Sequence, residues 1–65
     1  MVINKLKEIR MREYLLSSRK FAEKLGVAEQ QYQRYESGKV IPTLEIALKI
    51  SIILNKSVND IWLLK

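Results

Sequence analysis

The sequence predicts a compact all-α fold in which five short helices enclose one hydrophobic core. In each segment apolar residues recur at the spacing of one helix face, as Phe21, Ala22 and Leu25 do at i, i+1 and i+4. Residues suited to starting a helix precede these segments, and glycine or asparagine residues suited to ending one follow them. Because the chain has 65 residues, of which 48% are hydrophobic, we expect residues 1–65 to form a single domain.

The first helix is expected to begin after Asn4, which is a plausible N-cap, and to end around Tyr14. Leu6 and Ile9 lie on its inner face at helical spacing, and charged residues occupy its outer faces. Residues 1–3 precede this helix and are expected to be extended or disordered.

The second helix is expected to span Ser18 to Leu25. The hydroxyl of Ser17 can accept a hydrogen bond from a free backbone N–H of the first turn. Gly26 can then adopt the left-handed conformation that ends a helix without steric cost. The small side chain of Ala22 allows the next helix to cross closely, so these residues predict a helix, a tight turn and a second helix.

The third helix is expected to begin at Ala28 or Glu29 and to end at Gly38, with Tyr32 and Tyr35 facing the core. Glutamine and arginine on its outer face suit a DNA major groove, because their paired hydrogen-bonding groups match the edges of adenine and guanine respectively. The candidate base-reading residues are Glu29, Gln30, Gln33 and Arg34. Glu29 can instead favour only the N-terminus of its own helix.

The last two helices follow a second set of capping residues. Thr43 is the expected N-cap of the fourth helix, and Asn55 can take the left-handed position that ends it. Ser57 and Asp60 resemble a capping box, which predicts a fifth helix from Val58 to about Leu64.

These two helices carry more apolar residues than a lone small domain can bury. The excess predicts an isologous interface, in which two copies of the chain share the same surface. The residues expected in this dimer interface are Ile52, Ile53, Trp62, Leu63 and Leu64. For Trp62 the alternative is that it folds back over the edge of its own domain.

The chain from about Leu6 to Ile61 resembles the Cro/C1-type helix-turn-helix family, also called the Xre family of bacterial and phage regulators. The resemblance rests on three motifs that occur in order at the family's spacing: Phe21-Ala22-x-x-Leu25-Gly26-Val27, Tyr35-Glu36-x-Gly38-Lys39 and Pro42-x-Leu44. It implies a lambda-repressor-like fold whose helix-turn-helix lies at helices 2 and 3. The connection from Met11 to Ser17 departs from the family, which commonly has a shorter link containing a glycine.

The resemblance also implies an ion pair between Arg10 and Glu36, which would fix the orientation of the third helix; the alternative for Arg10 is a solvated surface residue. Ser18 stands where the family usually has a phosphate-binding glutamine, although it can also act as a second capping hydroxyl. The residues expected to contact DNA phosphates are Ser18, Arg19, Ser37 and Lys39. The alternative for the loop that follows the third helix is an ordinary solvated turn.

The composition favours a polyanionic partner and argues against catalysis. Twelve lysines and arginines against seven acidic residues give a net charge of +5. The chain has no cysteine and no histidine, so thiol chemistry, common zinc sites and imidazole catalysis are excluded. We therefore expect no enzyme activity, no metal, no cofactor and no small-molecule ligand. We also expect no membrane span and no signal peptide, and the expected compartment is the cytoplasm.

The function predicted from these features is that of a sequence-specific regulator of transcription, expected to be a repressor. It would bind double-stranded DNA as a homodimer on an inverted repeat, with the third helix in the major groove. The alternative is an antitoxin-like module whose apolar surface on helices 4 and 5 binds a partner protein.

Overall fold

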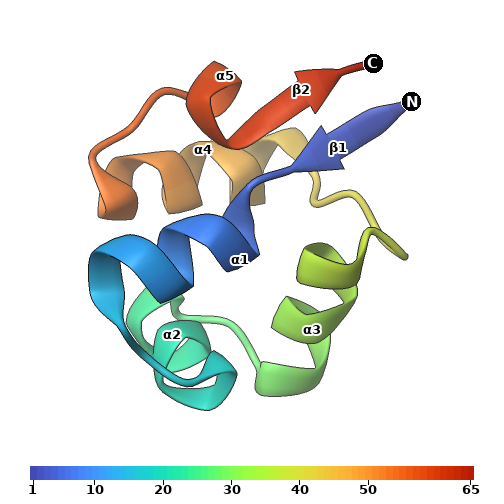
Figure 1. Ribbon diagram of the computed structural model, residues 1–65. Helices are drawn as coiled ribbons and strands as arrows, with labels where there is room; N and C mark the ends of the chain where they lie inside the picture. The colour runs from blue at the N-terminus through green and yellow to red at the C-terminus, as the bar shows by residue number, and fades with distance from the viewer.

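The two ends of the chain meet in a short antiparallel ribbon, and five helices pack around a single core beside it (Figure 1). The computed structural model describes residues 1–65. In chain order its elements are β1 (Val2–Asn4), α1 (Leu6–Ile9), the π-helical turn η1 (Arg10–Tyr14), α2 (Ser18–Leu25), α3 (Glu29–Ser37), α4 (Leu44–Leu54), α5 (Val58–Ile61) and β2 (Trp62–Leu64). The predicted all-α fold is confirmed, with the ribbon as a small addition.

The core is built from the inner faces of all five helices. Phe21 is completely buried, and its ring lies 5.3 Å from the ring of Tyr14 and 5.4 Å from that of Tyr32. Such tilted and edge-to-face contacts are favourable beyond the area they bury. The ten buried residues of the core cluster are Leu6, Ile9, Phe21, Ala22, Leu25, Tyr32, Tyr35, Ile50, Leu54 and Ile61.

The first helix ends at Tyr14, as predicted, but its last five residues widen into the π-helical turn η1. Leu15 follows with φ +54°, a left-handed conformation that is costly for a residue with a β-carbon.

The helix-turn-helix forms from the predicted local signals. The hydroxyl of Ser17 accepts from the backbone N–H of Lys20 at 3.2 Å, and Gly26 ends α2 with φ +74°. The predicted span Ser18–Leu25 is therefore confirmed. α3 begins at Glu29 and ends at Ser37, where Gly38 takes φ +83°.

The caps of α4 and α5 also form as predicted. Thr43 accepts from Ile46 N–H at 3.3 Å, and Asn55 ends α4 with φ +55°. The carboxylate of Asp60 accepts from the backbone N–H and the hydroxyl of Ser57, and these bonds lower the pKa of Asp60.

The predicted extent of the fifth helix is wrong, because α5 ends at Ile61. Residues Trp62–Leu64 are extended and pair with β1 in the register Val2 to Leu64, Ile3 to Leu63 and Asn4 to Trp62. One helical turn has few internal hydrogen bonds to lose, whereas the ribbon pairs the backbone of both chain ends. The residues expected to be extended or disordered before the first helix are thus extended. None of the helices has both the length and the apolar character needed to cross a membrane.

Candidate nucleic-acid interface

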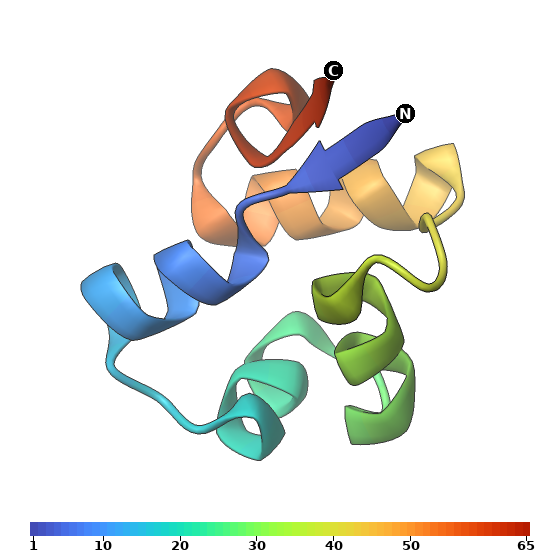
Figure 2. The same cartoon turned by 45° about the vertical axis from the view of Figure 1, so that its right-hand side comes forward.

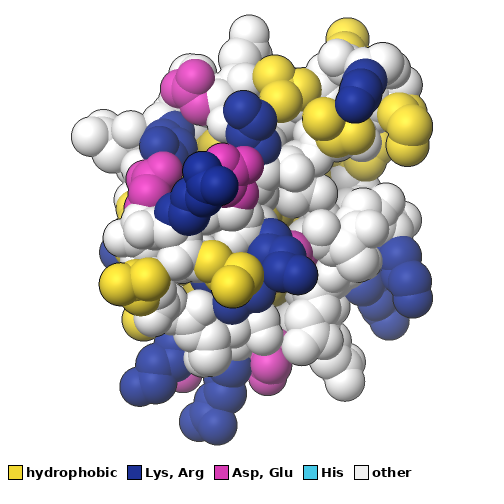
Figure 3. Space-filling model, viewed as in Figure 1, with side chains coloured by type: hydrophobic (Ala, Val, Ile, Leu, Met, Phe, Trp, Pro, Cys, Tyr) yellow, Lys and Arg dark blue, Asp and Glu magenta, His cyan; other side chains and the backbone are white.

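α2 and α3 lie at the end of the molecule opposite the ribbon, where α3 presents one side to solvent (Figure 2). Lysine and arginine side chains stand over α2 and beside α3 in Figure 3. A shallow hollow of about 420 Å³ follows the exposed side of α3. It is lined by Gln30, Gln33, Arg34, Ser37 and Lys39, and therefore by no acidic and no apolar side chain. Five residues predicted to contact DNA thus share one concave polar surface.

Gln30 and Arg34 are the most available residues of this surface. Both are exposed, and neither side chain makes a hydrogen bond or an ion pair within the protein. They lie four residues apart, which places them on the same face of α3 about one turn from each other. The free amide and guanidinium groups can therefore reach a ligand that lies along the helix.

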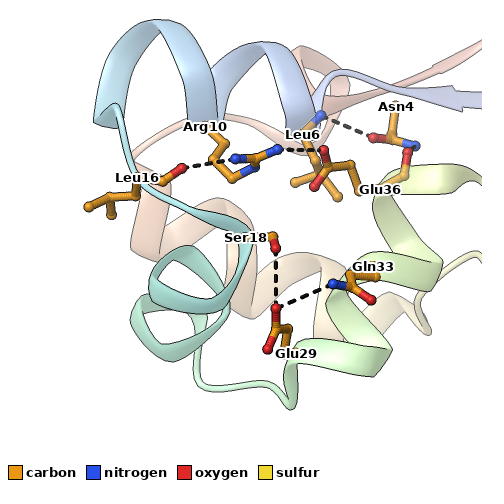
Figure 4. Close-up of polar contacts among 8 residues, drawn as sticks. All are labelled: Asn4, Leu6, Arg10, Leu16, Ser18, Glu29, Gln33 and Glu36. Carbon is orange, nitrogen blue, oxygen red and sulfur yellow. Dashed lines mark hydrogen bonds and ion pairs between the residues drawn. The ribbon is translucent and has the colours of Figure 1, made fainter.

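Glu29 has a different position from the other predicted base-reading residues. Its carboxylate accepts from the hydroxyl of Ser18 and from Nε2 of Gln33, each at 3.3 Å (Figure 4). The bond from Ser18 connects the first turn of α2 to α3. Glu29 is also the first residue of α3, so its negative charge lies at the helix N-terminus, where it is favourable. Glu29 therefore joins the two helices and orients Gln33, a role that sequence analysis missed because it depends on how α2 and α3 cross.

The residues predicted to contact phosphate lie on both sides of the α2–α3 unit. Ser37 and Lys39 line the hollow beside α3, and Arg19 is exposed next to Ser18 in the first turn of α2. Lys7 is a cation that sequence analysis missed. Together with Ser18 and Ser37 it lines a second polar hollow, of about 410 Å³, between the first three helices. Lys7 lies three residues before Arg10, on the same helix face, and this spacing is the feature of the sequence that could have identified it.

Arg10 and Glu36 form the ion pair that holds the third helix against the first (Figure 4). Nη2 of Arg10 donates to Oε1 of Glu36 at 3.0 Å, and the two side chains are only 14% and 12% exposed. Nη1 of Arg10 donates to the carbonyl oxygen of Leu16 at 2.9 Å. The hydrogen bond with Glu36 raises the pKa of Arg10 above its ordinary value. One guanidinium therefore connects η1, the link before α2, and α3.

The hydroxyl of Tyr32 is buried beside this ion pair and has no hydrogen-bond partner. Desolvation, followed by the nearby Glu36 carboxylate, raises the pKa of Tyr32 well above its ordinary value of 10.0. The folded protein thus favours the neutral phenol. In the unfolded chain the pKa of a tyrosine is about 10. The stability that the buried neutral phenol contributes is therefore complete below about pH 10, and it is lost as the pH rises from there toward the higher pKa of the folded protein.

Replacement of Tyr32 by phenylalanine is expected to change the free energy of unfolding at pH 7 by less than about 1 kcal/mol, because the removed hydroxyl is unpaired. Above pH 10 the variant is expected to lose stability less steeply than the wild type. Urea denaturation between pH 7 and pH 11 measures both effects. An equally steep alkaline loss in both proteins would contradict this assignment.

The residues predicted to form a dimer interface lie in separate parts of the surface. Ile52 and Ile53 are exposed near the C-terminal end of α4, whereas Leu64 is exposed at the tip of β2, on the other side of the molecule in Figure 1. Trp62 and Leu63 are half-buried, and Trp62 packs against the core. Trp62 therefore contacts its own domain, and its place in a dimer interface stays a prediction.

A more regular apolar surface runs along α4. Leu44, Leu48 and Ile52 follow one another at four-residue spacing and are 71%, 46% and 77% exposed. We call these three residues the α4 stripe. Residues at this spacing lie on one helix face, so the α4 stripe is a continuous line of apolar side chains open to solvent.

Comparison with known families agrees with this geometry. A family model described as Helix-turn-helix matches residues 6–61, and both strands of the ribbon lie outside this range. No curated protein matches the chain. The match covers both helices of the α2–α3 unit, the ion pair that supports them and the loop with Lys39. The chain therefore belongs to the Cro/C1-type helix-turn-helix family of DNA-binding transcription regulators.

Proposed function

We propose that this protein is a sequence-specific repressor that binds an inverted-repeat operator as a homodimer, with α3 of each copy in the major groove. The observation that carries the proposal is the exposure of Gln30 and Arg34, without partners, in one hollow lined only by polar residues. Gln30 can pair with N6 and N7 of adenine, and Arg34 with O6 and N7 of guanine. The net charge of +5 favours the approach to DNA.

The surrounding residues would place α3 in register with the duplex. Lys39, Ser37 and Arg19 are suited to phosphate contacts on either side of the groove, and Lys7 can extend this contact along the backbone. Glu29 is suited to holding Gln33 toward the groove. We favour repression because occupying a promoter requires no surface beyond these DNA contacts. The proposed compartment is the one that holds the DNA, the cytoplasm in bacteria.

The α4 stripe is the proposed contact between the two copies. Glu45 and Lys49 flank it and form an exposed ion pair at 3.4 Å within one helix. In an antiparallel arrangement of two α4 helices, Glu45 of one copy can lie opposite Lys49 of the other, so the flanking charges are complementary. The domain measures 27 × 22 × 20 Å, so two adjacent copies can reach successive major grooves, roughly 34 Å apart.

The same stripe supports a second candidate function, in which an antitoxin-like chain covers it with a partner protein. The supporting observation is again the exposed line of Leu44, Leu48 and Ile52. The two proposals differ in the mass of the purified protein: a homodimer has twice the mass of the chain, and a module that awaits another protein has the mass of one copy.

Selection of binding sites from random duplexes tests the leading proposal. The wild type is expected to recover two-fold symmetric sequences and to bind each duplex with two chains. Replacement of Ile52 by lysine would bury an unpaired charge at each end of the proposed seam, and this variant is expected to be monomeric and to recover half-sites.

Replacement of Leu64 by lysine is the matched control, because Leu64 is at least as exposed as Ile52 but lies outside the α4 stripe. Light scattering should show a dimer for this control. A wild type that recovers no enriched sequence would reject the DNA-binding proposal. A dimeric Ile52→Lys protein would reject the seam alone.

A further inference from the structure

Asn4 joins three elements through one side-chain amide, although it lies in β1, outside the residues that match the family (Figure 4). Its Nδ2 donates to the carbonyl oxygen of Tyr35 at 2.9 Å and to that of Glu36 at 3.3 Å. Its Oδ1 accepts from the backbone N–H of Leu6 at 3.0 Å. The same amide therefore holds the C-terminal turn of α3 and the first turn of α1.

These contacts satisfy groups that helices cannot satisfy themselves. The last carbonyls of a helix and its first N–H groups have no partner within the helix. At this site the carbonyl oxygen of Tyr35 also accepts from the backbone N–H of Gly38 at 3.1 Å, so Asn4 supplies its second donor. The carbonyl oxygen of Glu36 and the N–H of Leu6 at the start of α1 each gain a partner from the same side chain. A side-chain amide supplies both donor and acceptor from one group, and the two carbonyls determine its orientation because only the NH2 can donate.

The ribbon determines the position of Asn4. Asn4 pairs with Trp62 across the two strands, and the adjacent N–H of Lys5 donates to the carbonyl oxygen of Ile61 at 2.8 Å. Trp62 packs against the core, which anchors this end of the ribbon. The side chain of Asn4 thus links the position of the ribbon to that of α3, the helix that carries Arg34.

The C-terminal turn of α3, which Asn4 holds, also carries the unpaired guanidinium of Arg34. Arg34 directly precedes Tyr35, whose carbonyl oxygen Asn4 holds, and its own carbonyl oxygen accepts from Val40 N–H at 3.3 Å. Ser37 and Lys39 follow in the same segment. A shift of this turn would move the guanidinium of Arg34 relative to the first turn of α2.

We propose that Asn4 is a positioning residue for DNA recognition, which ties the β1–β2 ribbon to the C-terminal turn of α3 and so sets the direction of Arg34. The inference rests on the proposed function, because it concerns how α3 meets DNA. Linkage makes the effect reciprocal: DNA that holds α3 in place also stabilises the ribbon.

Replacement of Asn4 by aspartate separates the two halves of the clamp. The carboxylate still accepts from Leu6 N–H, but it has no N–H to donate and places negative charge against the carbonyl oxygens at the end of α3. The ratio of affinities for the selected duplex and a scrambled duplex, measured at one salt concentration, is expected to fall about tenfold. Affinity for the scrambled duplex is expected to stay within about twofold, since it depends on phosphate contacts.

Hydrogen exchange distinguishes this effect from a general loss of stability. In Asn4→Asp the Leu6 amide should remain protected, whereas the Gly38 and Val40 amides after α3 should exchange faster. Ile46→Ala is the matched control, because Ile46 packs against the core from α4 and lies far from the clamp in sequence. It should lower the stability and leave the affinity ratio unchanged.

A measurement on the wild type requires no substitution. Binding of the selected duplex should slow local exchange of the Lys5 amide, which reports on the ribbon. Unchanged exchange at Lys5, or an unchanged affinity ratio in Asn4→Asp, would overturn the positioning role while leaving DNA recognition intact. A wild type that does not prefer the selected duplex would instead reject the proposed function itself.

Discussion

Replacement of Arg10 by alanine is expected to lower the free energy of unfolding by about 3–5 kcal/mol, the typical cost of removing one partner from a buried ion pair. The substitution leaves the carboxylate of Glu36 in an interior where it is only 12% exposed. It also removes the donor to the carbonyl oxygen of Leu16. A domain of this size has a total stability of only about 5 kcal/mol, so much of the variant should be unfolded at 25 °C. Urea denaturation followed by circular dichroism measures the loss.

Arg12→Ala is the matched control for this prediction. Arg12 pairs with Glu8 at 3.2 Å on the exposed side of the same segment, where their side chains are 78% and 52% exposed. Such a pair contributes at most about 0.5 kcal/mol. If the two variants were equally stable, the buried pair would not hold α3 in place. Joint replacement of Arg10 by methionine and Glu36 by leucine should recover most of the lost stability, because no charge remains buried.

Replacement of Arg34 by alanine is expected to relax the preference for one base pair in each half-site by about 1–3 kcal/mol. The loss should appear as reduced discrimination, because the side chain is free of partners in the protein and its removal disturbs no internal contact. Gln30→Ala should relax a different base pair, since Gln30 lies one turn earlier on α3. Fluorescence anisotropy with single-position variants of the selected duplex measures both effects.

Lys39→Ala provides the contrast for these two variants. Lys39 lies in the loop after α3, where it is suited to a phosphate contact. Its removal should weaken binding to all sequences alike and reduce the slope of log K against log salt by about 1. Base preferences that survive both Arg34→Ala and Gln30→Ala would exclude these two residues as the readers of sequence.

The elements that sequence analysis predicted correctly are those decided within a few residues. Ser17 and Gly26 bound α2 where expected, because a serine cap and a left-handed glycine act on the adjacent turn alone. Thr43 and Asn55 bound α4 for the same reason. The error lies after Ile61, where the helical pattern continues but the chain turns into β2.

The candidate interface likewise contains some features that local sequence patterns predict and others that they do not. The exposure of Gln30 and Arg34 could be predicted from helical periodicity, since Tyr32 and Tyr35 mark the buried side of α3. The bond from Ser18 to Glu29 could not, because it spans eleven residues and depends on how closely α2 and α3 cross. The separation of Ile52 from Leu64 likewise depends on the direction in which the chain leaves α5.

The amino-acid sequence by itself determined the five helices, the helix-turn-helix and the outward polar face of α3, because periodicity and capping are local properties of the chain. Tertiary structure alone decided the β1–β2 ribbon and the clamp of Asn4 on Tyr35 and Glu36. Those contacts join residues 31 to 62 positions apart in sequence, and no spacing rule relates such residues before the core has brought their backbones together.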